Sequence, residues 1–404
     1  MQLRLPVPGR GGPSGSVPLA VGMVLGAAVD AVLGDPRRAH PVAAYGRAVS
    51  AVQRRLYRDD RARGAVFTAV CVAGPVLGGV ALQRATRGRP VARALVTAAA
   101  TWAVVGGTTL RREAAAMGAS LERADLPAAR ARLPHLAGRD PSVLDASGLA
   151  RATVESVAEN TSDAVVAPLV WGAIGGIPGL LGYRAVNTLD AMVGHRSPRY
   201  ARFGWASARL DDLVNLVPAR FTALLTVAAA PLVGGSRGES WRVWRRDGRA
   251  HPSPNAGHCE ASAAGALGVR LGGRNVYAGR TEDRPHLGDG PSPSPADVAR
   301  AARLSGAVAL GALALTAGHV AARPARRRLY AAARAERASG RLRLGAGYGT
   351  ITGREPRDAV APATLAARAR RLGMGRAPLT AGDQREGVAP ATLAARARRL
   401  GVAR

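Results

Sequence analysis

The chain has 404 residues, of which 47% are hydrophobic and only 4% aromatic, and its formal net charge is +30. The sequence contains no lysine, so a lysine nucleophile, a Schiff base and a P-loop lysine are excluded. The arginines form no aromatic-studded stripe and no zinc-finger spacing occurs, so nucleic acid is not an expected partner. The two cysteines, Cys71 and Cys259, lie far apart in the sequence and indicate no disulfide framework.

The first third of the chain predicts membrane helices behind a short extension. Residues 1–16 are rich in Gly and Pro, and we expect them to be a disordered N-terminal extension. Residues 17–33 carry one charge, Asp30, and no convincing cleavage site precedes the following turn, which favours an uncleaved first membrane helix. Residues 64–82 are uncharged and long enough to cross hydrocarbon, and residues 94–110 are nearly so. Their short arginine-rich connection predicts a helical hairpin.

Three further apolar segments follow. Residues 164–183 are uncharged, but Pro168 and the GGIPG run at 175–179 break a straight helix, so this segment is expected to be re-entrant or buried against protein. Residues 213–235 contain polar interruptions and are doubtful as a span. Residues 304–322 are uncharged apart from a histidine. The fold class predicted is all-α: a polytopic helical membrane protein with polar motifs in loops and at helix ends.

This membrane domain is expected to cover residues 17–340, followed by a low-complexity tail rich in Ala and Arg at 341–404. The tail repeats the 14-residue segment VAPATLAARARRLG, at 360–373 and again at 388–401. Each copy could form a basic helix on an anionic membrane surface, and the alternative that we favour is a duplicated, dispensable tail.

The distribution of arginine predicts a topology and exposes a conflict in it. Residues 34–63 and 323–343 are both dense in arginine, so the positive-inside rule places both in the cytoplasm. Five candidate spans lie between them, which is the wrong parity. At least one candidate therefore does not cross, and the suspects are 164–183 and 213–235.

Polar stretches interrupt the apolar chain and hold the candidate functional residues. In LGDPRRAHPVAAYGR, at residues 33–47, Asp35 lies beside several arginines, although taken alone this stretch is better explained as a simple turn with positive-inside arginines. In the second stretch Glu155, Glu159 and Asp163 would share one helix face, where like charges repel. A Mg²⁺ ion or a nucleotide–Mg²⁺ complex would offset that repulsion, and a solvated face is the alternative.

Two later stretches carry amides, carboxylates and arginines together. Residues 183–220 contain two groups at helical spacing, a pattern that suits an anionic, metal-bearing ligand; they are Arg184, Asn187 and Asp190, and then Arg209, Asp211, Asp212 and Asn215. In residues 251–280, Asn255 and Glu260 are further candidate ligand contacts, whereas the histidines and cysteine match no zinc spacing. Intramembrane polar residues also mark permeation paths, so transport stays open on these facts alone.

Several long motifs occur together in one order. They are LGDPRRAHPV, ESVAENTSDAVVAPLVW, YRAVNTLDAMVGHRSPRY, FGWASARLDDLVNLVPAR, HPSPNAGHCEASAAGALGVRLGG and RPHLGDG. In this order, and over roughly residues 20–322, they resemble the CobD/CbiB family, membrane-bound adenosylcobinamide-phosphate synthases of cobalamin biosynthesis. One departure is Ala164, where the family pattern is expected to have glycine.

The resemblance implies an ATP-dependent ligase that joins aminopropanol, or its phosphate, to the free carboxyl of adenosylcobyric acid, with Mg²⁺. It implies a multi-pass protein of the cell membrane with the active site facing the cytoplasm, and other cobalamin-biosynthesis proteins as possible partners. A corrinoid-binding or corrinoid-transporting membrane protein without ligase activity is the alternative.

We assign hypothetical roles to the polar residues on this basis. The catalytic candidates are Glu159, Asp163 and Asp190. The metal candidates are Glu155, Glu159 and Asp163. The substrate-binding candidates are Asp35, Arg184, Asn187, Arg209, Asp211, Asp212, Asn255 and Glu260.

Overall fold

The computed structural model describes residues 15–35, 41–195, 197–277 and 280–345. Most of the predicted N-terminal extension and both copies of the duplicated tail segment lie outside these residues. The chain divides into a compact unit over residues 1–337 and a second unit over residues 338–404. The site and the fold considered below belong to the first unit.

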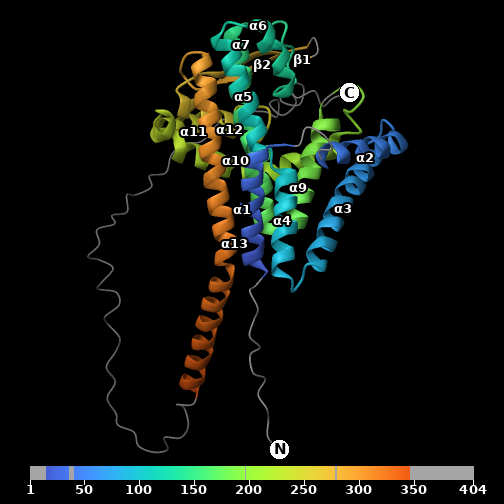
Figure 1. The fold of residues 1–404 in the computed structure, drawn as a ribbon, viewed down its shortest axis with the longest axis vertical. Coiled ribbons are helices and arrows are strands. Elements are labelled where there is room, and N and C mark those ends of the chain that lie inside the picture. Colours follow the sequence, from blue (N-terminus) through green and yellow to red (C-terminus); the bar gives the residue numbers. More distant parts are fainter. Residues whose placement is uncertain (1–14, 36–40, 196, 278–279, 346–404) are drawn as a thin grey trace, which may run out of the picture. The chain divides into compact units, whose positions relative to one another are not determined.

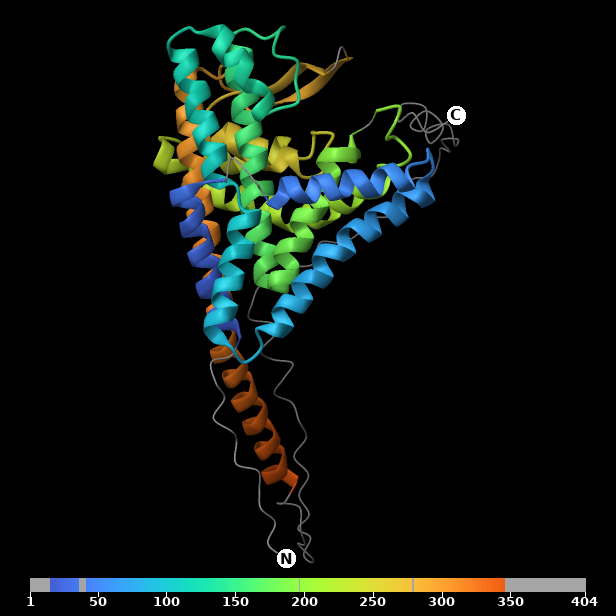
Figure 2. The same ribbon diagram turned by 45° about the vertical axis from the view of Figure 1, so that its right-hand side comes forward.

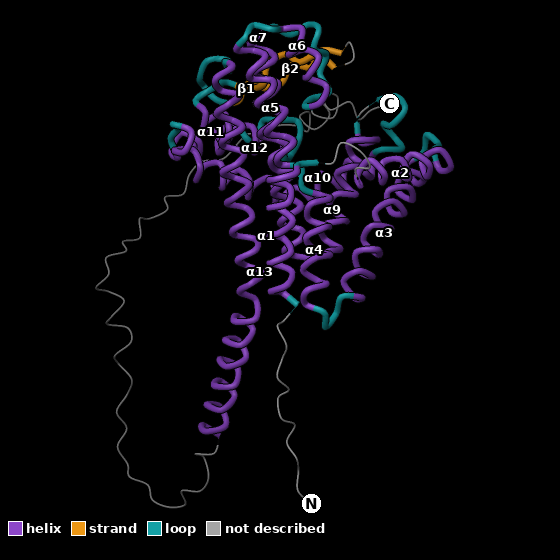
Figure 3. Tube along the Cα trace, in the orientation of Figure 1, coloured by secondary structure: helices purple, strands orange, loops and turns teal. Residues whose placement is uncertain are grey.

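Most of the described residues are helical, as the sequence predicts (Figures 1 and 3). The N-terminal helices are α1 (Ser16–Leu33), α2 (Pro41–Leu56), α3 (Arg61–Ala85), α4 (Pro90–Val104), α5 (Gly107–Glu122) and α6 (Leu126–Arg132). The central ones are α7 (Ala146–Thr161), α8 (Ala167–Gly175), α9 (Ile177–Leu189) and α10 (Trp205–Ala229). The last are α11 (Arg237–Asp247), α12 (Ala256–Leu267) and α13 (Pro295–Gly345).

Short elements connect these helices, and one of them is a β-hairpin that the sequence analysis did not predict. Strands β1 (Leu271–Tyr277) and β2 (Arg280–Leu287) pair in antiparallel register, with Leu271 opposite Leu287. Two π-turns, Ser162–Val166 and Asp190–Gly194, adjoin α7 and α9. Two 3₁₀ turns, Leu133–His135 and Ala230–Val233, end α6 and α10.

Among the described residues, five helical segments are long and apolar enough to cross a membrane. They are Ser16–Leu33, Arg61–Ala85, Pro90–Glu122, Trp205–Val233 and Pro295–Ala325. The protein is therefore an all-α polytopic membrane protein. The predicted span 94–110 runs across a break, because α4 ends at Val104 and α5 begins at Gly107.

Small residues let the first membrane helices approach each other closely. Gly22 and Gly26 are four residues apart in α1, and a Cβ at either position would overlap backbone oxygens of α4, those of Ala94 and Ala98. Within a bilayer the hydrophobic effect does not drive helices together. Small residues at this spacing favour their association because they let the two backbones pack closely. A larger side chain on this face of α1 would push α4 away.

The segment 164–183 is re-entrant, which explains its proline and glycine content. Helices α8 and α9 meet at Gly176, whose φ of 68° is readily adopted only by glycine. The backbone N–H of Ile177 donates to the side-chain oxygen of Gln83 at 3.3 Å, and Arg323 donates to the carbonyl of Ala173. The tip of the hairpin thus lies beside the end of α3 and beside Arg323 of α13. Helix α9 then carries the chain back toward the end of the bundle from which α8 came.

Helix α10 is long enough to span, but both of its ends lie at one end of the bundle. Trp205 donates its indole N–H to the carbonyl of Arg61, where α3 begins, at 2.9 Å. Arg300, near the start of α13, donates to the carbonyl of Val233 at 3.0 Å. Helix α10 therefore runs across the bundle, whereas α1, α3, α4 and α13 run along it (Figures 1 and 2).

This arrangement corrects the expected topology. Arg61 lies at the opposite end of the bundle from Arg323, because only α3, α4 and α13 run lengthwise between them in the described part of the chain. The expectation that residues 34–63 and 323–343 share one side is therefore wrong. Neither of the two suspected segments, 164–183 and 213–235, carries the chain through the bundle. Three lengthwise helices remain, and an odd number leaves the two arginine-rich segments at opposite ends.

The arrangement predicts opposite accessibility of two engineered cysteines. In a background where Cys71 and Cys259 are replaced by serine, we expect Ser142→Cys and Arg87→Cys to react with a membrane-impermeant maleimide from opposite sides. Both positions are exposed, Ser142 beyond α6 at the end where α3 begins and Arg87 in the α3–α4 connection. Labelling of inside-out and right-side-out vesicles makes the measurement, and labelling of both from the same side would contradict the arrangement.

Candidate functional site

Polar side chains from four separate segments converge on one small cavity. The cavity has a volume of about 30 Å³ and lies among α7, the first π-turn, α10 and α12. Its polar lining consists of Glu159, Ser162, Asp163, Asp211, Asn215, Ser253, Asn255 and Cys259. A volume of this size admits one or two water-sized groups or an ion, and not a corrinoid ring. A large ligand could therefore reach these groups only with a small projecting part.

The two π-turns place acidic residues at both ends of the re-entrant hairpin. Asp163 lies in the turn Ser162–Val166 and Asp190 begins the turn Asp190–Gly194. A π-turn inserts one extra residue into a helix, and such turns occur frequently at functional sites. Here they also interrupt the simple helical spacing from which a shared face of Glu155, Glu159 and Asp163 was predicted.

Amide and guanidinium groups connect Asp163 to α9. Asn187 donates from Nδ2 to the Oδ2 of Asp163 at 3.5 Å, and Arg184 donates to the Oδ1 of Asn187 at 3.4 Å. The Nε of Arg184 is buried and has no hydrogen-bond partner among the described residues. The guanidinium of Arg184 thus reaches Asp163 through one intervening side chain, that of Asn187, and its Nε is still free to donate a hydrogen bond.

Helix α10 holds a second carboxylate in a fixed orientation. Tyr183 donates its hydroxyl to the Oδ1 of Asn215 at 2.9 Å, and Asn215 donates from Nδ2 to the Oδ2 of Asp211 at 3.0 Å. The other oxygen of Asp211, Oδ1, is buried without a hydrogen-bond partner in the described residues. An unsatisfied buried carboxylate oxygen is costly, so this atom is a candidate contact for a bound ligand.

The cavity carboxylates raise one another's pKa. Burial raises the pKa of Glu159, and the charges of Arg284 and Arg139 oppose this effect. Burial also raises the pKa of Asp163 well above its usual range, and the charges of Asp211, Glu159 and Asp190 add to the increase. In the absence of a bound cation, the surroundings of Glu159 and Asp163 therefore favour the protonated form of each carboxyl group.

The third carboxylate of the predicted ladder has a different environment. Glu155 is 2% exposed and forms an ion pair with Arg139, and its Oε1 accepts the backbone N–H of Gly272 at 2.7 Å. It therefore ties α7 to a loop and to the β-hairpin. Because both carboxylate oxygens of Glu155 already have protein partners, the structure does not favour the metal-binding role predicted for this residue.

Glu155 belongs to an inner polar cluster behind the cavity, which consists of Arg139, Glu155, His251, Glu260 and Arg284. The Nε2 of His251 lies 3.9 Å from the Oε1 of Glu260 and 3.3 Å from Arg284. Burial and the charge of Arg284 lower the pKa of His251 to about 4, while burial and the charge of Glu155 raise that of Glu260. Near neutral pH the histidine is therefore uncharged, and its contact with Glu260 is no ion pair.

Of the remaining predicted residues, Asn255 lines the cavity, whereas Arg209, Asp212 and Asp35 lie outside its lining. Arg209 is 73% exposed on its side chain and lies 3.7 Å from the Oδ2 of Asp212. The backbone carbonyl of Asp212 accepts the amide of Asn255 at 2.8 Å. The backbone N–H of Asp35 donates to the hydroxyl of Thr109 at 3.1 Å, and the charge of the Asp35 side chain acts on Arg184. The structure thus brings together residues predicted from four distant motifs.

A divalent cation fits this donor set only with help from a ligand. Among the described residues, no group of three His, Cys, Asp or Glu side chains converges closely enough to hold a metal ion. Carboxylate oxygens of Glu159, Asp163 and Asp211 nevertheless face one cavity, and one of them lacks a partner. Mg²⁺ in nucleotide sites is bound by one or two carboxylates together with phosphate oxygens and water, which suits this arrangement.

Sequence reasoning missed several members of the site. Arg139 was not singled out, although it is buried and pairs with Glu155. Tyr183 and Cys259 were not proposed as site residues, and they orient Asn215 and line the cavity. Arg284 begins the motif RPHLGDG, and its place in that motif was a signal that it has a role. The spacing of the motif could not show that this role is a contact with His251.

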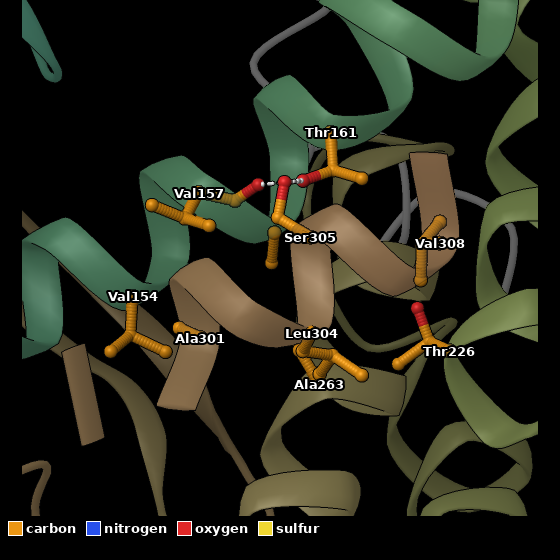
Figure 4. A pocket seen from close by; sticks show the side chains of 10 residues that line it. Val154, Val157, Thr161, Thr226, Ala263, Ala301, Leu304, Ser305 and Val308 are labelled. Atoms are coloured by element: carbon orange, nitrogen blue, oxygen red, sulfur yellow. Dashed lines mark hydrogen bonds between the residues drawn. The ribbon is translucent and has the colours of Figure 1, made fainter. Parts of the chain in front are cut away.

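Packing behind the site joins α7 to α13. The hydroxyls of Thr161 and Ser305 lie 2.7 Å apart, and Thr161 also donates to the carbonyl of Val157 at 2.6 Å (Figure 4). A cavity of about 20 Å³ lies beside them, lined mainly by valine, alanine and leucine side chains. It has room for one water molecule at most. This contact fixes the end of α7 from which Glu159 and Asp163 project.

Fold and site together define a class: a helical membrane protein with a buried carboxylate–amide–arginine site at one end of its bundle. The family described as "CobD/Cbib protein" matches residues 23–305 of the chain. The chain therefore belongs to the CobD/CbiB family.

Named relatives agree with this membership. The chain is 55% identical to the "Cobalamin biosynthesis protein CobD" of Mycobacterium tuberculosis, over 73% of this chain and 94% of that protein. It is 47% identical to the protein of that name from Geobacter metallireducens, over 65% of this chain and 84% of that one. For the Rhodobacter capsulatus protein the identity is 43%, over 69% and 90%. No solved structure matches the chain.

The raised pKa of Asp163 gives a prediction with a definite sign. At any pH above the ordinary pKa, the folded protein must either protonate this carboxyl group or keep it ionised in a place that disfavours charge. Asp163→Asn should therefore raise the melting temperature of the ligand-free protein at pH 8. The gain should shrink as the pH falls and vanish below about 4, the ordinary pKa of the side chain. Thermal unfolding in detergent across this pH range makes the measurement. The exposed Glu122→Gln is the control, and a melting temperature lowered at pH 8 would contradict the prediction.

The ion pair of Glu155 gives a second prediction. Glu155→Ala leaves the buried guanidinium of Arg139 without its carboxylate, so we expect a loss of about 3–5 kcal/mol in the free energy of unfolding. Denaturant titration of the purified protein, with Glu122→Ala as the control, tests this. Unchanged stability combined with a loss of Mg²⁺ binding would instead restore the metal role for Glu155.

Proposed function

We propose that the chain is an adenosylcobinamide-phosphate synthase of adenosylcobalamin biosynthesis. It would join aminopropanol, or aminopropanol phosphate, to the free carboxyl of adenosylcobyric acid with ATP as cosubstrate. Membership of a family whose relatives are named cobalamin biosynthesis proteins supports the pathway. The observation that supports a ligase within that pathway is the convergence of Glu159, Asp163 and Asp211 on one cavity beside Arg184.

The chemistry explains why such a site would be needed. A carboxylate is a poor acyl donor, because its carbon is a weak electrophile and its oxygen a poor leaving group. Its oxygen would therefore first attack the γ-phosphorus of ATP, giving an acyl phosphate and ADP. The amine nitrogen would then form the amide bond to the acyl carbon as phosphate leaves. Negative charge concentrates on the transferring phosphoryl group, where guanidinium donors stabilise it most. Arg184 lies next to the cavity and has an unpartnered buried Nε for this purpose.

The carboxylates would hold the cation that accompanies ATP. Mg²⁺, when bound, supplies positive charge that neutralises the phosphate oxygens. Glu159, Asp163 and Asp211 would bind it together with those oxygens, and this would remove the mutual repulsion that raises the pKa of Glu159 and Asp163. The small size of the cavity fits the ion, with the corrinoid held outside it.

Asp190 is the proposed acceptor for the proton that the attacking amine loses. It begins the second π-turn, and its charge acts on Asp211 and Asp163. Burial and the charge of Asp212 raise its pKa, which makes it a stronger base than an exposed aspartate. Arg209, Asp212 and Asp35, at the edge of the site, would then contact the larger substrate.

We further propose that the site faces the cytoplasm of a cell-membrane protein, where ATP is available. All four polar motif regions lie at the end of the bundle where α3 begins, which supports access from a single side. Other cobalamin-biosynthesis proteins are proposed partners at that surface.

The test is a complete reaction in vitro. Detergent-purified protein is incubated with adenosylcobyric acid, aminopropanol phosphate, ATP and Mg²⁺, with aminopropanol in a parallel reaction, and the corrinoids are analysed by mass spectrometry. We expect an amide-linked product only when ATP is present. Glu159→Gln, Asp163→Asn and Asp211→Asn should each lower its rate by about 100-fold or more, because they remove charge from the reacting centre.

The control variant for these substitutions is Glu122→Gln, which removes a carboxylate from an exposed position of α5. It should keep the full rate. Saturable corrinoid binding without product in any reaction would favour the alternative, a binding or transport protein. Full turnover in the three site variants would show that the ligase uses a different site.

A further inference from the structure

A groove outside the candidate site has the features of a lipid site. It lies between α5, α13 and the turn Ala230–Val233, and its volume is about 540 Å³. The lining contains two arginines, Arg111 and Arg303, and no carboxylate; the other lining residues are alanine, glycine and leucine. From this geometry we infer that the groove binds an anionic phospholipid, with the phosphate between the two guanidinium groups.

The depth of the two arginines follows from the sequence. Arg111 is the first charged residue after the uncharged run 94–110, and Arg303 directly precedes the uncharged run 304–322. Uncharged runs of this length lie in hydrocarbon, so both guanidinium groups lie where lipid headgroups begin. Two segments that are far apart in the sequence thus present arginine at the same level of the membrane and in the same groove.

Apolar side chains continue the groove into the membrane. Leu310 is two helical turns below Arg303 on α13 and is 69% exposed, and Leu232, beside the start of α13, lines the groove and is 72% exposed. A phospholipid matches this arrangement, because its anionic phosphate can contact the arginines while its acyl chain lies against the leucines. A soluble phosphate ion would use the arginines and leave these leucines without a partner.

A glycine keeps the upper part of the groove open. A Cβ at Gly306 would lie 2.9 Å from a terminal nitrogen of Arg111, so the guanidinium lies directly against the backbone of α13. Arg111 donates to the hydroxyl of Thr108 at 3.2 Å, which fixes its direction. Asp30 accepts the backbone N–H of Thr108 at 3.1 Å, so this carboxylate is engaged by the start of α5. Arg111 lines the groove in this orientation.

The test measures lipid retention by the intact, delipidated protein. The protein in detergent is mixed with dioleoyl-phosphatidylglycerol or with dioleoyl-phosphatidylcholine, and bound lipid is counted by native mass spectrometry. We expect tighter retention of phosphatidylglycerol, and an affinity lowered about tenfold in Arg303→Gln and in Arg111→Gln. Gly306→Leu should lower it as well, since the new side chain fills the groove.

The matched control is Arg123→Gln, which removes one exposed arginine at the end of α5 outside the groove and should leave retention unchanged. Equal retention of both lipids, or unchanged retention in Arg303→Gln, would overturn the inference. Displacement of the lipid by inorganic phosphate would also overturn it and leave an anion site. A shift from dimer to monomer in Gly306→Leu without any change in lipid would identify the groove as a contact between two copies of the chain. The amide-forming assay is independent of all these outcomes.

Discussion

The structure depends on one physical constraint: several carboxylates lie within one small volume beside an apolar bundle. Burial penalises each negative charge, and each raises the pKa of the next, so the arrangement persists only with compensating groups around it. The protein supplies them from every side: Asn187 and Arg184 on Asp163, Asn215 on Asp211, and Arg139 on Glu155. These partners come from three different segments, the loop that holds Arg139 and the helices α9 and α10, and the surrounding helices hold these segments together.

The membrane part of the fold provides a rigid support for this end of the molecule. Helices α1 and α4 pack closely through glycine, and the re-entrant hairpin inserts between lengthwise helices and returns. Because the hairpin returns, both of its ends lie at the level of the site, and each of them carries an acidic residue there. A simple crossing helix would have placed Asp163 and Asp190 at opposite faces of the membrane.

Much of this could be predicted from the sequence, for identifiable reasons. Uncharged runs predicted the helices α1, α3 and α13, and the GGIPG run predicted the interruption that became the re-entrant turn. The candidate residues were found because polar groups within apolar segments are conspicuous. The topology could not be derived, because length and hydropathy do not distinguish α10, which runs across the bundle, from a crossing helix. The role of Glu155 was also out of reach, since its partners Arg139 and Gly272 are distant in sequence.

The π-turns have a consequence for how this sequence tolerates changes in length. Each accommodates one residue beyond regular α-helical winding, and one residue turns an α-helix by about 100°. Deleting a single apolar residue from Ser162–Val166 would let the helix wind regularly and would rotate everything before it relative to everything after it. The composition of the segment would barely change, yet Glu159 and Asn187 would no longer face the same space. In this region the number of residues between the motifs is as important as the identity of the residues within them.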